Sequence, residues 1–396
     1  MSGSVLIKNI ETIVSGDLNA PLLDGEAIRI ENGRIAAIGG ESDCAGDVEQ
    51  TIDAGGMTAA PGLIDSHVHT TQGDFTPRQN TLGWIESCMN CGITAMISAG
   101  EVHTPGRPRD GLGARAMAIL AAKSFRNLRP GGVKVMAGAV MLEPGLKPSD
   151  FDELDEAGVE LVGEVGLGAV RDPDEVRPLL AAARAKGMRV LCHTGGGSIP
   201  GSMVVDADMI LAVGPDVACH LNGGPTGLAM EDIERLIKES DVTLELVQTG
   251  NQKRAVEATD LFLAEGVLDR VIVGTDMPSG TGVIPYGVMR SVAVMTAFSD
   301  LSPEAALCTA TGNTARVHKM DVGFLKVGAP ADIAVLDAPW GSTGKDALAA
   351  LKAGDTPSLG AVLIDGVLRM SKSRTSPPCT RTIHFEGGHI PAGGGH

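Results

Sequence analysis

The chain has 396 residues, enough for one domain of about 250 residues and a smaller module. Its formal net charge of −17 argues against a nucleic-acid partner and against anionic membrane surfaces. It has no long apolar run, no signal-peptide pattern at its start and seven scattered cysteines typical of reduced thiols, so we expect a cytoplasmic protein without a membrane span.

The N-terminal residues have the pattern of β structure. Residues 5–14 are strand-like, and residues 27–38 alternate apolar and polar side chains around Asn32-Gly33. Because an Asn-Gly pair between alternating runs is a strong hairpin signal, this segment predicts two antiparallel strands joined by a tight turn.

From Gly62 onward, short apolar runs alternate with helix-like stretches such as residues 173–186 and 229–240. Short runs that are apolar throughout are typical of strands buried on both faces of a parallel sheet. Eight β-then-α units in succession predict an α/β fold, a closed (β/α)8 barrel of the TIM type. The runs are residues 62–70, 92–100, 133–142, 160–167, 188–195, 216–222, 242–248 and 270–277.

After two predicted helices, near 286–299 and at 303–318, β signals return at residues 332–336 and 361–370, where Asp365-Gly366 is a second hairpin signal. We therefore expect both ends of the chain to meet in one small domain beside the barrel. The predicted division is 1–60 plus 323–370 for a composite β-sandwich domain, 61–322 for the barrel, and 371–396 for a C-terminal extension that is extended or poorly ordered.

Histidines and one aspartate recur where the apolar runs end. His67 and His69 lie two apart in the first run, so they point the same way on a strand. This pair alone is weak evidence, since any two polar residues near a strand end would look alike. However, 27 residues separate His193 from His220, and 56 separate His220 from Asp276. One barrel unit spans about 31 residues, so these side chains are expected at the carboxyl ends of strands, where barrel active sites lie.

Glu164 lies inside the apolar fourth run, where a carboxylate is costly to bury unless it is paired or bound to a metal. Its two oxygens could bridge two cations; a salt-bridged structural role, or Glu101 as the bridge instead, are the alternatives. Imidazole and carboxylate ligands suit Zn²⁺, Fe²⁺, Mn²⁺ or Co²⁺. We expect two divalent metal ions, zinc or iron or both, held by His67, His69, Glu164, His193, His220 and Asp276.

Cysteines are not expected among these ligands. Cys192 and Cys219 each precede a candidate histidine, and neighbouring residues on a strand face opposite sides, so both thiols are predicted to point into the helix layer. Cys88 and Cys91 form an isolated pair in a helical stretch and are interpreted as core or surface thiols.

Two segments resemble the amidohydrolase superfamily. Residues 60–69, APGLIDSHVH, are similar to its first-strand signature, and residues 324–336, FLKVGAPADIAVL, resemble its return to the composite β domain. With the histidines and Asp276, the resemblance runs from about residue 5 to 370. It implies hydrolysis of cyclic amides, ureas or amidines, or deamination, by metal-activated water, with Asp276 as the catalytic base. Many binuclear members bridge their metals with a carboxylated lysine, where this chain has Glu164.

Within the superfamily, the whole chain resembles members that open the lactam ring of a tetrahydronicotinate. This resemblance implies 6-oxo-1,4,5,6-tetrahydronicotinate as the substrate, 2-formylglutarate and ammonia as products, and a homo-oligomer, with a tetramer favoured. The alternatives are a mononuclear deaminase, another cyclic ureidohydrolase of the dihydroorotase, hydantoinase or imidazolonepropionase type, and an inactive member that acts as a scaffold.

A carboxylated lactam needs a local cation, because the net charge of the protein repels anions. The loop after the second run contains His103, Arg107 and Arg109, and an arginine there can hold a carboxylate through two hydrogen bonds. Arginines on a surface loop without any binding role would give the same sequence pattern. We expect one of these three residues to bind the carboxylate of the substrate.

Overall fold

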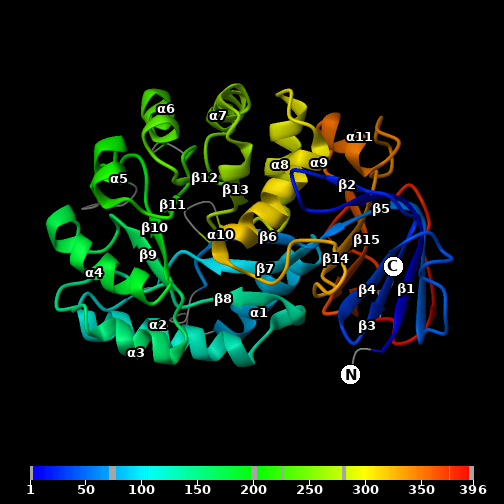
Figure 1. Ribbon diagram of the computed structural model, residues 1–396, viewed down its shortest axis with the longest axis horizontal. Helices are drawn as coiled ribbons and strands as arrows, with labels where there is room; N and C mark the ends of the chain where they lie inside the picture. The colour runs from blue at the N-terminus through cyan, green and yellow to red at the C-terminus, as the bar shows by residue number, and fades with distance from the viewer. Residues whose placement is uncertain are drawn as a thin grey trace.

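Figure 1 shows two parts side by side, a set of strands surrounded by helices and a β module that contains both chain ends. The β module is built from the first and last segments of the chain, coloured blue and orange to red. The computed structural model describes residues 3–70, 77–102, 104, 106–197, 203–223, 227–278, 282–373 and 375–391.

Each of the eight predicted apolar runs contains a strand, and the paired strands run parallel. They form two sheets, β6-β7-β8 and β9-β10-β11-β12-β13. Parallel bridges from Val140 to Val162 and from Val68 to Met277 link the sheets at both sides. The strands are β6 (Leu63–Val68), β7 (Ile93–Ser98), β8 (Lys134–Met136), β9 (Leu161–Val165), β10 (Arg189–Cys192), β11 (Val217–Ala218), β12 (Thr243–Val247) and β13 (Val271–Gly274).

Helices follow most of these strands and lie outside them (Figure 1). Several begin at a side chain that accepts a backbone N–H of the first turn, as Asp110, Asp206 and Asn251 do, which satisfies groups that a helix start leaves unpaired. The helices are α1 (Pro77–Met89), α2 (Gly111–Asn127), α3 (Asp150–Ala157), α4 (Pro173–Ala185), α5 (Ala207–Val213), α6 (Met230–Glu239), α7 (Gln252–Glu265) and α8 (Gly287–Ala297), with the short 3-10 turns η1 (Pro130–Gly132) and η2 (Leu268–Arg270).

The helix expected over residues 303–318 is divided. It consists of α9 (Pro303–Cys308), the π turn η3 (Thr309–Asn313) and α10 (Thr314–His318). At Gly312 the chain passes so close to the carbonyl oxygen of Gly16 that a Cβ there would collide with it. The helical periodicity of the sequence could not predict this contact with the β module.

Strands from both chain ends pair in a single mixed sheet of nine strands among the described residues. The hairpin signals are confirmed, since Asn32 and Asp365 both have the positive φ that a tight hairpin turn requires. The elements are β1 (Val5–Val14), β2 (Leu22–Leu23), β3 (Ala27–Glu31), β4 (Arg34–Gly39), β5 (Gln50–Pro61), β14 (Ile333–Asp337), α11 (Ala347–Lys352), β15 (Ser358–Ile364), β16 (Val367–Met370) and β17 (His384–Gly387).

The C-terminal extension contributes one of these strands, β17, which pairs antiparallel with β5. This strand was not predicted, because a four-residue segment among glycines, prolines and threonines has too little alternation of apolar and polar residues. Ile383 and Phe385 pack against the buried core of the sheet and so attach this segment.

Side chains of the eight parallel strands pack in two directions. One cluster, which includes Leu244 and Leu246, packs toward the helices, whereas another gathers inward-facing residues such as Ile64 and Leu191. None of the helices in the described ranges is long and apolar enough to cross a membrane.

Candidate metal centre

The structure brings all six candidate metal ligands together at the carboxyl ends of the parallel strands. Five of them are buried, and the side chain of Asp276 is 22% exposed. His67 lies in β6 with His69 just after it, Glu164 lies in β9, and the others lie one or two residues after the ends of β10, β11 and β13. The periodic spacing in the sequence therefore corresponds to one location in space.

One oxygen of Glu164 faces two imidazoles. Its Oε1 lies 2.8 Å from Nε2 of His220 and 3.6 Å from Nδ1 of His193, and those two nitrogens are 3.0 Å apart. Ligand atoms of a tetrahedral zinc ion with bonds of about 2.1 Å are roughly 3.4 Å apart. These three atoms are therefore spaced to share one ion.

The other oxygen of Glu164 faces the first-strand histidines. Its Oε2 lies 3.8 Å from Nε2 of His67 and 3.9 Å from Nε2 of His69. Oδ1 of Asp276 is 3.1 Å from Nε2 of His69 and 3.7 Å from Nε2 of His67. A second set of ligand atoms thus lies on the opposite side of the same carboxylate.

The chemistry of these groups fits bound cations. Nε2 of His67 is buried and has no hydrogen-bond partner within the described part of the chain, although it lies between two carboxylates. Burial alone would raise the pKa of Glu164, but the neighbouring imidazoles of His67, His193 and His220 outweigh it and hold the pKa well below its usual value. An ionised carboxylate beside an unpartnered imidazole nitrogen is the donor set that divalent metals bind.

Hydrogen bonds on the far side of the His69 and His193 rings turn the other nitrogen of each ring toward Glu164. Nδ1 of His69 lies 2.7 Å from the carbonyl oxygen of Gly100, and Nε2 of His193 lies 3.2 Å from that of Gly196. The carbonyls accept the ring N–H, which leaves the other nitrogen of each imidazole as a lone-pair donor.

Two site residues adopt a backbone conformation that is uncommon outside glycine. φ is 38° at His220 and 59° at Asp276. Such strain is concentrated at functional sites, where the surrounding fold enforces it. The side chain of Asp276 is oriented by Thr249, whose Oγ1 donates to Oδ2 at 3.2 Å. Thr249 could not be predicted from the sequence, since no local pattern separates it from other loop threonines.

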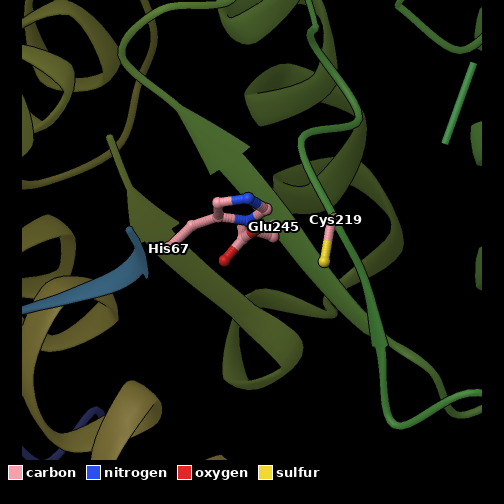
Figure 2. A group of neighbouring side chains, drawn as sticks. All are labelled: His67, Cys219 and Glu245. Atoms are coloured by element: carbon pink, nitrogen blue, oxygen red, sulfur yellow. Dashed lines mark hydrogen bonds and ion pairs between the residues drawn. The ribbon is translucent and has the colours of Figure 1, made fainter. Parts of the chain in front are cut away.

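Glu245 of β12 is a second residue that the sequence analysis does not identify. It is fully buried on the inward side of its strand, and its Oε2 lies 2.8 Å from Nδ1 of His67. Figure 2 shows its carboxylate against the His67 ring, with Cys219 on the neighbouring segment. Its position inside the seventh apolar run was the available signal, the same one that identifies Glu164.

The predicted orientation of Cys219 is wrong. Cys192 packs toward the helices as expected, but Cys219 belongs to the inward-facing cluster, and its Sγ is within 4.8 Å of the ligand atoms of His67 and Glu245. The alternation of a strand does not apply here, because β11 ends at Ala218 and the chain turns sharply at His220. Burial raises the pKa of the Cys219 thiol well above its usual value.

Glu101 is the alternative bridging carboxylate. Among the described residues, the groups of possible ligand atoms contain Glu164 but not Glu101. Oε1 of Glu101 accepts a hydrogen bond from Thr70, and burial raises the pKa of Glu101 to about 8.

The candidate carboxylate-binding residues differ in their surroundings. Arg107 is buried, forms an ion pair with Glu143 at 2.8 Å and donates to the carbonyl oxygen of Leu167. The side chain of Arg109 is 58% exposed and lies 4.0 Å from Glu143. His103 lies outside the described residues.

Comparison with known proteins is consistent with this geometry. Residues 58–368 match the model of the amidohydrolase family, and the chain belongs to that family. It is 47% identical over 378 residues to the enamidase of Eubacterium barkeri, covering 95% of this chain and 98% of the enamidase. A crystal structure of enamidase, described as a new member of the amidohydrolase superfamily, matches with a TM-score of 0.92 and 46% identity, covering 97% of this chain and all of that one.

More distant relatives share less. The imidazolonepropionase of Streptomyces avermitilis is 27% identical over 370 residues, covering 80% of this chain and 82% of that protein. A prolidase solved with N-methylphosphonate-L-proline is 18% identical, with a TM-score of 0.65, covering 93% of this chain and all of that one. That last similarity shows the fold alone.

Proposed function

We propose that the protein is a binuclear metal-dependent hydrolase that opens a lactam ring. The observation that carries this proposal is the position of Glu164, which presents one oxygen to His193 and His220 and the other to His67 and His69. A mononuclear deaminase would not need a carboxylate between two sets of ligand atoms. Zinc, iron or one of each suits these nitrogen and oxygen ligands.

The substrate we propose is 6-oxo-1,4,5,6-tetrahydronicotinate. The 47% identity to enamidase along nearly the full length of both chains supports it. One water adds to the lactam carbonyl carbon, the carbon–nitrogen bond breaks, and the nitrogen takes up a proton. A second water hydrolyses the resulting enamine to an aldehyde, which yields 2-formylglutarate and ammonia.

In this reaction Asp276 moves the proton. When bound, the two cations would lower the pKa of a water and polarise the amide carbonyl. Oδ1 of Asp276 faces the ligand atoms, and its Oδ2 is held by Thr249, so the carboxylate is oriented to accept a proton from the attacking water. Asp276 then passes that proton to the leaving nitrogen, a role that contributes roughly 10²–10⁴ in rate.

The architecture we infer around this site is a closed (β/α)8 barrel over residues 61–322, with a composite β-sandwich domain from 1–60 and 323–370 and an extension over 371–396. The bridges between the two parallel sheets and the shared nine-stranded sheet support this division. The family resemblance favours a homotetramer, which light scattering on the purified protein would test.

Turnover and metal content together test the function. We expect two divalent ions per chain by elemental analysis, and release of ammonia with formation of an aldehyde from the tetrahydronicotinate lactam. Hydantoins and amino-purines serve as control substrates. One ion per chain and deamination of an amino-purine without ring opening would instead establish the mononuclear deaminase.

A further inference from the structure

Glu245 carries an inference that rests on the proposed metal centre and extends it. Its carboxylate is fully buried, and its partners in the described structure are an imidazole, a hydroxyl and a backbone N–H. Burying a carboxylate costs free energy of folding unless its oxygens accept hydrogen bonds. These three donors offset that cost for Glu245.

The three donors come from segments that also supply candidate metal ligands. Oε2 of Glu245 accepts from Nδ1 of His67 at 2.8 Å and from the backbone N–H of His220 at 3.2 Å. Oε1 accepts from Oγ of Ser66 at 2.6 Å. One oxygen atom therefore contacts a ligand residue from each of the two sets.

Each contact sets a property that metal binding needs. Accepting the N–H at Nδ1 leaves the lone pair of His67 on Nε2, the atom that faces Glu164 and lacks any other partner in the described chain. Accepting the backbone N–H stabilises His220 at its positive φ, the conformation in which its Nε2 reaches Oε1 of Glu164. Glu164 faces the ligand atoms of both sets of candidate ligands. Glu245 instead contacts the opposite ring nitrogen of His67 and the backbone N–H of His220.

The same cluster could instead be a metal site formed by His67, Glu245 and Cys219. The hydrogen bonds disfavour it, because both oxygens of Glu245 already accept from other protein donors, Oε2 from the backbone N–H of His220 and Oε1 from Oγ of Ser66. An ion there would also leave Nε2 of His67 buried without a partner.

We propose that Glu245 is a positioning residue that fixes the tautomer of His67 and the backbone of His220 at once, and so couples the two metal positions. Loss of the charge of Glu245 weakens the binding of both ions, although Glu245 itself would contact neither ion. Residues behind metal-bound histidines commonly contribute 10- to 100-fold to metal affinity.

The test compares Glu245→Gln with Glu245→Leu in the full chain. Glutamine keeps an oxygen that can accept from His67 and His220 but removes the charge, and it carries the test if the leucine variant fails to fold. Asp337→Asn is the matched control, because Asp337 is also a fully buried carboxylate in a strand and accepts a backbone N–H, from Arg381 of the C-terminal extension, whose guanidinium also forms an ion pair with it at 3.4 Å. The readouts are metal content after dialysis against graded zinc chelator, the visible spectrum of the Co²⁺-loaded protein, and the melting temperature of the metal-free protein.

We expect Glu245→Gln to release both ions at about 10- to 100-fold lower chelator concentration and to shift the cobalt bands, with a larger loss in Glu245→Leu. Asp337→Asn should lower the melting temperature and leave metal affinity unchanged. Unchanged metal binding in Glu245→Gln, or loss of only one ion, would overturn the coupling. A thiolate-to-cobalt band that disappears in Cys219→Ser would also overturn it, since the cluster would then bind the ion itself. Wild-type protein that binds no metal would refute the proposed centre first, and the inference with it.

Discussion

Charged side chains at this site are held in one orientation by hydrogen bonds. Asp276 illustrates this, because its Oδ1 contacts His69 and its Oδ2 accepts from Thr249. Burial alone would raise the pKa of Asp276, but the hydrogen bond from His69 and the nearby imidazoles outweigh it and hold the pKa at about 2. The carboxylate is therefore ionised and directed toward the candidate ligands, as a proton acceptor must be.

The exchange Asp276→Asn separates proton transfer from metal binding. Asparagine keeps the size of the side chain but cannot accept the proton, so we expect kcat to fall by at least ~10²-fold; if Asp276 acts only in proton transfer, both ions stay bound. Steady-state kinetics and elemental analysis measure the two effects. Loss of metal along with activity would make Asp276 chiefly a ligand, and near-normal turnover would contradict the mechanism.

Glu101 gives a prediction for stability as a function of pH. Burial raises its pKa from 4.5 to about 8, so between these values the folded protein keeps a proton that the unfolded chain has released. The folded state then binds more protons, and the contribution of Glu101 to stability falls as the pH rises through this window.

We therefore expect Glu101→Gln to match the wild type near pH 4.5 and to be more stable by at least about 1 kcal/mol near pH 8, since a change of one in pKa corresponds to about 1.4 kcal/mol. Denaturant unfolding of both proteins across this range measures the difference. A difference that does not grow with pH would show that Glu101 is ionised in the folded protein.

Contacts between elements hold the first and eighth parallel strands together next to the site. Oγ1 and the backbone N–H of Thr275, just after β13, both donate to Asp65 in β6, at 2.6 and 2.8 Å. At Gly274 a Cβ would come within 2.8 Å of His67, so only glycine permits this approach of the two strands. These contacts place His67 and Asp276 side by side.

The exchange Thr275→Val removes the hydroxyl without changing the shape. It leaves an oxygen of a buried carboxylate without its partner, so we expect unfolding to become easier by about 1–3 kcal/mol. Thr259→Val is the control, because its buried hydroxyl only donates to Ala255 within its own helix. Equal losses in both variants, measured by denaturant unfolding, would argue against a special role for the strand contact.

The loops at the same end of the strands give a prediction for the substrate carboxylate. Arg107 is already neutralised by Glu143, whereas the guanidinium of Arg109 is exposed. We expect Arg109→Ala to raise KM about ten- to a hundredfold for the carboxylated lactam and hardly at all for an uncharged lactam, given that a hydrogen bond to a charged group is worth roughly 1.5–3 kcal/mol.

Arg107→Ala is expected to act on the fold instead. It leaves Glu143 buried without its partner, which typically costs about 3–5 kcal/mol of stability. Melting temperatures and KM values for both substrates distinguish the two arginines. Equal KM increases on both lactams for Arg109→Ala would mean that the anion is held elsewhere.

Across the whole molecule, the β module unites segments from both ends of the chain. β5 pairs with β1, β14 and β17, and it leads through Gly62 directly into β6, which carries His67. The module therefore anchors the strand from which the metal centre begins. Figure 1 shows it packed along one side of the helices and strands that form the site.

The attachment of the C-terminal extension is testable. Phe385 of β17 packs against the module core, whereas Ile390 nearby is 43% exposed. We expect Phe385→Ser to lower the free energy of unfolding by about 1–3 kcal/mol, and Ile390→Ser to change it by less than about 0.5 kcal/mol. If thermal and denaturant unfolding show equal effects, β17 adds nothing to the module.

The sequence by itself determined the order of elements and the candidate ligand set. Eight apolar runs mark eight strands, because strands buried on both faces leave a local pattern in the chain. The ligand positions could be predicted because each barrel unit has a similar length, so spacing along the chain reports equivalent places around the strands. His193, His220 and Asp276 follow this rule, and Glu164 stands out as a charge within an apolar run.

Only the tertiary structure decided which side chains support those ligands. Glu245 and Thr249 act through partners far away in the chain, and no periodicity links Glu245 to His67 across 178 residues. The inward turn of Cys219 and the pairing of Arg107 with Glu143 depend in the same way on where a strand ends and which loops meet. Local patterns arise from the geometry of one element, whereas these contacts arise from the packing of several.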